Sequence, residues 1–237
     1  ALAQIPAGAA IRDEALVLQG RVLIQEARTL KKDSAAPERA AEAAQKLQEA
    51  IATLRQAQGQ GLFPTPATPK AMYLIAVCLL EMGDQRGALY QFQRTASAHP
   101  GTPEALAADF EQAELLRRLK RYDEALAAYG RALKPIADPQ MYDNPWLPLD
   151  SLRRRALQAY QEYLDGHDYP RCLALVQSFF PAFPKDHALQ AEAEAYRTWG
   201  HNLLAQTEHL PWSKAVPVAR EGRRHLRRAG AIYEQLA

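Results

Sequence analysis

The sequence predicts an all-α protein built as an array of antiparallel helix pairs. Good helix formers dominate the chain, and apolar residues make up 48% of it, which is enough for a continuous core. Apolar residues recur every three or four positions and nowhere alternate as they would in a strand. Two segments also match each other at a fixed spacing, which is typical of a repeat architecture.

The first 58 residues are expected to form a pair of long helices. Residues 11–31 carry one apolar stripe, and residues 36–57 carry another that begins near Pro37, a residue suited to a first helical turn. A linker rich in Gly and Pro follows at residues 59–68. We therefore treat residues 1–58 as an N-terminal helix pair.

Residues 69–134 contain the two segments that match. Ala88 and Ala125 are 37 residues apart, and the same spacing pairs Tyr73 with Phe110. It also pairs Ala76 with Ala113, Leu79 with Leu116, and Phe92 with Tyr129. Each segment is predicted to be two amphipathic helices around a short turn.

These positions resemble the tetratricopeptide repeat. That family has small residues at positions 8, 20 and 27 of its repeat, an aromatic residue at position 24 and proline at position 32. In the first segment the small positions hold Ala76, Ala88 and Thr95, the aromatic is Phe92 and the proline is Pro100. In the second segment they hold Ala113, Ala125 and Ala132, the aromatic is Tyr129, and Pro135 comes two residues late. Small side chains let paired helices approach closely, and the aromatic fills the gap between pairs. The resemblance implies a right-handed superhelical array, a tetratricopeptide-like α-solenoid.

Two features favour the bacterial periplasm or cell envelope over the cytoplasm. The longer junction at residues 99–105 resembles repeats of envelope proteins such as the Tol–Pal coordinator and outer-membrane assembly lipoproteins. The chain also opens with Ala1-Leu2-Ala3-Gln4, which has the A-x-A form of a signal-peptidase site. The longest apolar run, residues 71–80, is too short to cross a bilayer, so no transmembrane segment is expected.

The C-terminal part is predicted to be more irregular. Residues 135–150 form a connection with four prolines, which either folds over adjacent helices or contacts a partner through Tyr142 and Trp146. Residues 151–237 then form degenerate helix pairs, 151–164 with 169–180 and 187–206 with 214–236. Tyr160 and Phe179 occupy positions where small residues belong.

The resemblance places the first helix of each pair on a concave, partner-binding surface. The residues at the corresponding positions are Lys70, Tyr73, Val77, Leu80, Glu81, Ala107, Phe110, Glu114, Arg117 and Arg118. Tyr73 and Phe110 would form an aromatic ladder there, unless they pack mainly against the neighbouring repeat. Tyr73 and Val77 do not match the Lys and Asn with which chaperone-binding members grip a C-terminal carboxylate.

The last helix carries two contrasting faces. Arginines share one face, which is either a solvated surface or an anionic contact: Arg220, Arg223, Arg224, Arg227 and Arg228. The opposite stripe is expected to be buried and contains Gly222, Leu226, Ala229, Tyr233 and Leu236. Ile232 points away from that stripe, so we expect a further helix beyond residue 237, or a second molecule, to cover it.

The predicted function is that of a protein–protein interaction scaffold. The alternative is a self-assembly module whose main partner is another copy or the rest of its own chain. The chain shows no catalytic motif, metal-site spacing or cofactor fingerprint, and with a net charge of +2 nucleic acid is not an expected partner. His167, between Asp165 and Asp168, fits a helix–helix turn, and Cys78 and Cys172 fit a helical core.

Overall fold

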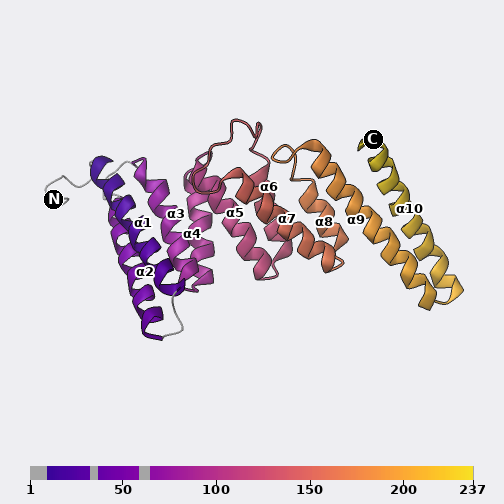
Figure 1. Ribbon diagram of the computed structural model, residues 1–237, viewed down its shortest axis with the longest axis horizontal. Coiled ribbons are helices and arrows are strands. Elements are labelled where there is room, and N and C mark those ends of the chain that lie inside the picture. The colour runs from indigo at the N-terminus through magenta and orange to yellow at the C-terminus, as the bar shows by residue number, and fades with distance from the viewer. Residues whose placement is uncertain (1–9, 33–36, 59–64, 237) are drawn as a thin grey trace. The chain divides into compact units, whose positions relative to one another are not determined.

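The structure is a computed structural model that describes residues 10–32, 37–58 and 65–236, and within these ranges it consists of helices and connections without a strand (Figure 1). The all-α prediction is confirmed. The chain forms two compact units, Ala1–Leu119 and Lys120–Ala237. The boundary falls between the two helices of the second repeat, inside the region 69–134. The segment Ala1–Gln4 and most of the 59–68 linker lie outside the described residues.

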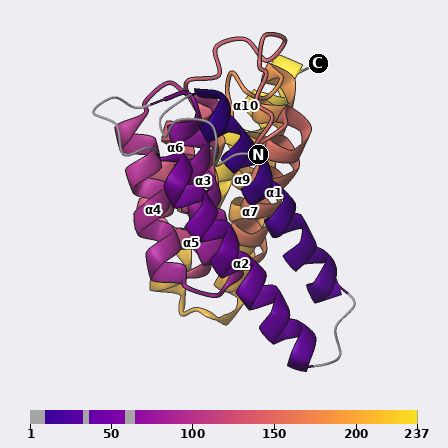
Figure 2. The ribbon, with the colours of Figure 1, turned by 90° about the vertical axis from the view of Figure 1, so that its left-hand side faces the viewer.

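Unit 1 consists of helices whose bounds follow the predicted apolar periodicity closely. They are α1 (Ala10–Lys32), α2 (Pro37–Ala57), α3 (Ala67–Glu81), α4 (Gln85–Ala98) and α5 (Pro103–Arg118). Helices α1 and α2 pack side by side, as Figure 2 shows, and α3 packs in the same way on α4. Gly20 permits the first contact, because a Cβ atom there would lie 2.6 Å from Leu54 Cδ2.

The predicted small and aromatic repeat positions form the core of the α3–α4 pair. Ala76, Ala88 and Phe92 are completely buried. The turn between these helices contains Gly83 at φ +85°, and Asp84 caps α4 by accepting a hydrogen bond from the Gly87 amide at 2.9 Å. Small residues at the contact and a glycine turn therefore fix this helix pair.

Unit 2 contains α6 (Tyr122–Leu133), α7 (Leu149–Asp165), α8 (Tyr169–Val176), α9 (Lys185–Gln206), a short 3-10 helix (Thr207–His209) and α10 (Trp212–Leu236). Helix α8 ends four residues earlier than predicted, and turns continue to Phe183. Arg171 of α8 lies 4.7 Å from the centroid of the Tyr122 ring and 3.6 Å from Asp123, which fixes α6 on α8.

Helices α9 and α10 pack through a glycine contact. A Cβ atom on Gly200 would lie 2.8 Å from the Gly222 carbonyl oxygen, so neither position accepts a larger residue without moving a helix. Beside it, the ring of His225 stacks on Trp199 at 3.9 Å between centroids. The buried residues of α10 are Gly222, His225, Ala229 and Ile232.

The prediction that Ile232 lies uncovered by the helices of this chain is wrong. Its side chain is 2% exposed, whereas Tyr233 is 37% exposed. Consecutive residues on a helix point about 100° apart, and α9 lies on the side of α10 that Ile232 faces. Ile232 therefore needs no additional helix to cover it.

Candidate protein-interaction face

The odd-numbered helices of unit 1 lie next to one another, α1 beside α3 and α3 beside α5. Two ion pairs join α1 to α3. Lys70 Nζ lies 2.6 Å from Glu14 Oε1, and Arg28 Nε lies 2.7 Å from Glu81 Oε1. We call this surface of α1, α3 and α5 the odd-helix face.

Four of the predicted contact residues lie partly open on α3: Lys70, Val77, Leu80 and Glu81. Lys70, Val77 and Glu81 are spaced at i, i+7 and i+11, so they follow one line along the helix. The line has an apolar centre and an ion pair at each end, over about 16 Å. This arrangement could hold a short segment with apolar residues in its middle and polar ends.

Tyr73 and Phe110 do not form an open aromatic ladder. Tyr73 is 5% exposed and Phe110 is completely buried. The Tyr73 ring lies 5.9 Å from the ring of Phe92, tilted by 52°, which is the geometry of a core contact. The structure corrects the prediction for these two residues: their rings pack in the interior.

On α5 the remaining predicted positions differ in exposure. Ala107 and Glu114 are buried, and Arg117 Nη2 lies 3.2 Å from Glu114 Oε2 with both side chains only 9% exposed. Arg118 is exposed and donates from Nε to the Glu114 carbonyl oxygen at 3.4 Å. Among these positions of α5, Arg118 is therefore the most accessible to a ligand.

The proline-rich connection, residues 135–150, is held by its own hydrogen bonds. Asn144 is buried, and its Oδ1 accepts from the Trp146 amide at 2.9 Å and the Leu147 amide at 3.2 Å. The Tyr142 hydroxyl donates to the Leu147 carbonyl oxygen at 2.8 Å, and burial raises the pKa of Tyr142 to about 12. Met141 is 80% exposed at the tip. A partner contact by Tyr142 or Trp146 remains a prediction.

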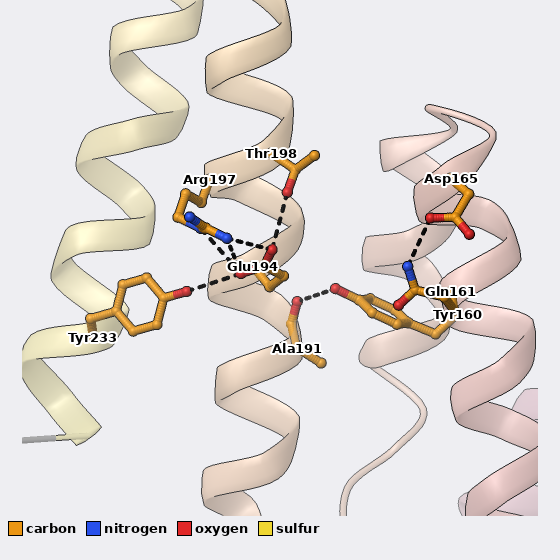
Figure 3. Close-up of polar contacts among 8 residues, drawn as sticks. All are labelled: Tyr160, Gln161, Asp165, Ala191, Glu194, Arg197, Thr198 and Tyr233. Atoms are coloured by element: carbon orange, nitrogen blue, oxygen red, sulfur yellow. Dashed lines mark hydrogen bonds and ion pairs between the residues drawn. The ribbon is translucent and has the colours of Figure 1, made fainter.

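The helices of unit 2 are linked by hydrogen bonds between their side chains and backbones (Figure 3). Tyr160 of α7 donates to the Ala191 carbonyl oxygen of α9 at 2.8 Å, and Tyr233 of α10 donates to Glu194 Oε2 at 3.4 Å. Glu194 also accepts from Arg197 at 2.7 Å, which lowers the pKa of its carboxyl group. These contacts join α7 to α9 and α9 to α10, which lie from right to left in the view.

The five C-terminal arginines are all exposed on one side of α10, as the spacing predicts. Gly222 and Ala229 on the opposite side are buried. Next to the arginines in sequence, His225 is 6% exposed; burial lowers its pKa, and the charge of Arg224 lowers it further. The sequence pattern of α10 did not indicate that His225 is buried.

The histidine and cysteines considered for chemistry lie in a turn and in the helical core, respectively. His167 adopts φ +58° in the turn, and Asp168 caps α8 by accepting from the Arg171 amide at 3.4 Å. Cys78 and Cys172 are fully buried, and burial raises the pKa of each thiol to about 12. A thiol with so high a pKa is a poor nucleophile.

Side-by-side helix pairs with small residues at their contacts define an all-α helical-repeat protein. The tetratricopeptide-repeat family model matches residues 39–101 and 79–142. The predicted repeats at 69–134 lie inside the matched region. None of the described helices is long and apolar enough to span a membrane.

Solved structures with a similar fold include a putative kinesin light chain from Podosopora anserina with nearly identical TPR-like repeats. A single-substitution variant of that protein aligns with 15% identity and a TM-score of 0.50, over 91% of this chain and 94% of that chain. A second structure of the same kinesin light chain aligns with 14% identity and a TM-score of 0.48, covering 86% and 93%. BtubC (BKLC) from P. vanneervenii aligns with 15% identity and a TM-score of 0.44, covering 94% and 92%. No curated protein sequence matches the chain.

Proposed function

We propose that this protein is a non-catalytic scaffold that holds a segment of a partner protein against the odd-helix face of unit 1. Tetratricopeptide repeats are generally protein-interaction modules. The observation that carries the proposal is the line on α3 in which Val77 lies partly open between the ion pairs Lys70–Glu14 and Glu81–Arg28. A span of about 16 Å fits roughly five residues of an extended chain.

The test is capture of partners from native extract by the full chain, followed by mass spectrometry. Val77→Arg places a charge at the open apolar centre and should abolish enrichment of the specific partner. Tyr90→Arg is the matched control, because Tyr90 lies on α4 and is 63% exposed. Equal capture by both variants, with unchanged melting, would remove the odd-helix face as the binding site.

A second candidate, self-association, is supported by an apolar stripe on α1. Ile11, Leu18 and Val22 are 75%, 57% and 56% exposed, and their spacing places them on one side of the helix. If this stripe joins two copies, light scattering should show a dimer that Leu18→Glu converts to a monomer. A monomeric wild-type chain at high concentration would exclude this candidate.

The compartment we propose is the bacterial cell envelope or periplasm. It is supported by the repeat spacing of 37 residues, which resembles that of envelope proteins. Fractionation of the source cells, with detection of the protein by antibody, tests it directly. Recovery of the protein with cytosolic markers would contradict the assignment.

A further inference from the structure

The exposed side of α10 carries a concentrated positive charge. Its arginine row is defined as Arg220, Arg223, Arg224, Arg227 and Arg228, and all five side chains are exposed. The spacing i, i+3, i+4, i+7 and i+8 makes a continuous row about 12 Å long on one side of the helix. It is a convex ridge, because it lies on the outside of a single helix.

Few carboxylates balance this charge. Arg224 lies 3.4 Å from the exposed Glu221 Oε1, and Arg228 lies 3.7 Å from Oε1 of the half-buried Glu192. Within residues 10–32, 37–58 and 65–236, the remaining three arginines of the row have no ion pair: Arg220, Arg223 and Arg227. Exposed pairs contribute little, so most of the charge remains available to a ligand.

The arrangement is unfavourable for the isolated helix. Like charges three or four residues apart destabilise a helix by a few tenths of a kcal/mol per pair. The helix dipole does not offset this repulsion, because its effect is confined to the last turn and α10 continues two turns past Arg228, to Leu236. Apart from the exposed Arg224–Glu221 pair, the row therefore has no stabilising contact within its own helix.

The row is held on a rigid support. Gly200 and Gly222 bring α9 and α10 into backbone contact, and His225 stacks on Trp199 from within the arginine segment. About two turns beyond His225, Tyr233 hydrogen-bonds Glu194. A ligand that binds the row need not order the backbone, which reduces the entropic cost of binding.

We propose that the arginine row binds an acidic helical segment of a partner protein. Planar guanidinium groups match carboxylates in a bidentate manner. A helix with Glu or Asp every three or four residues repeats its charges at the spacing of the row, and it can lie along a ridge. The buried apolar side of α10 cannot enter a lipid bilayer. The exposed arginine face carries no aromatic residue, whereas proteins that bind single-stranded nucleic acid interleave aromatics with their cations.

The probe is a fluorescein-labelled helical peptide with glutamates at i, i+3, i+4 and i+7 on one face, and its affinity for the full chain is measured by anisotropy. A peptide of equal composition with the glutamates spread around the helix should bind several-fold more weakly. The triple variant R220Q/R223Q/R227Q should lose affinity by about tenfold. Its melting temperature should stay the same or rise, because repulsion is relieved.

The matched control is R86Q/R94Q/R154Q, which removes the same charge from exposed positions on α4 and α7. It should change affinity less than twofold. Equal losses in both triple variants would reduce the effect to net charge and overturn the proposal. Equal affinity for both peptides would overturn it too. The proposal would also be overturned if phosphatidylserine vesicles or a single-stranded oligonucleotide bound more tightly than the peptide and depended on the arginine row. That result would assign the row to lipid or nucleic acid.

Discussion

Replacing Gly200 by alanine should destabilise unit 2, because the two helices touch at this residue. The added Cβ would lie 2.7 Å from Leu226 Cγ and 2.8 Å from the Gly222 carbonyl oxygen. The leucine can rotate, but the carbonyl belongs to the backbone of α10 and can move only with that helix. Such overpacking costs about 1–3 kcal/mol.

A glycine elsewhere in α10 supplies the control. Gly230 is exposed, and a Cβ atom there would meet nothing within 4 Å. Alanine is favoured over glycine in a helix by about 1 kcal/mol, so Gly230→Ala should raise the free energy of unfolding by up to that amount. Gly200→Ala gains the same preference and loses it to overpacking, for a net loss of about 0–2 kcal/mol.

Urea unfolding followed by tryptophan fluorescence measures this difference for unit 2. All three tryptophans lie in unit 2: Trp146, Trp199 and Trp212. The two variants should differ by about 1–3 kcal/mol in the free energy of unfolding. If Gly200→Ala proves as stable as Gly230→Ala, the close contact between α9 and α10 is not the geometry of the protein.

Three further predictions concern the turns, the pH dependence and the thiols. Lys120 adopts φ +60°, at the position equivalent to Gly83, so Lys120→Gly should raise the free energy of unfolding by about 1 kcal/mol in urea titrations. Burial lowers the folded-state pKa of His225 below 6.5, so unit 2 should be fully stable above about pH 6.5 and lose stability as the pH falls below that value. His225→Phe should flatten this pH dependence of the urea unfolding midpoint followed by fluorescence. Cys78 and Cys172 should react slowly with a thiol reagent in the native protein, and Gly200→Ala should accelerate only Cys172, since each thiol reports its own unit.

Periodicity and turn residues predicted most of the fold. The apolar stripes defined α1 and α2 to within a residue or two, and the 37-residue spacing placed Ala88 and Phe92 in the core of a helix pair. Helix ends were less predictable. Helix α8 stops at Val176 because the chain then enters turns that bury Phe179 and Phe183, a tertiary contact that no local signal indicates.

The candidate site was harder to predict from the sequence, because the side chains of consecutive residues on a helix point only about 100° apart. From the sequence alone, Tyr73 fits either the open side or the inner side of α3; in the structure its ring packs against Phe92 in the core. For the same reason, Ile232 is buried and Tyr233 is exposed, the reverse of what the sequence predicted. The ion-pair partners Glu14 and Arg28 were missed, since they belong to α1, which lies outside the recognised repeats.

The two proposed surfaces use charge in different ways. On the odd-helix face, Lys70 and Glu81 are already paired with carboxylate and guanidinium groups of α1. Their charges chiefly hold the helices in register, so discrimination between ligands there must come mainly from the apolar centre at Val77. On α10, Arg220 and Arg223 have no such partners among the described residues, and their charge is available to a ligand. High salt should therefore weaken binding at α10 and leave binding at Val77 nearly unchanged, because screening acts on exposed charges and not on apolar contacts.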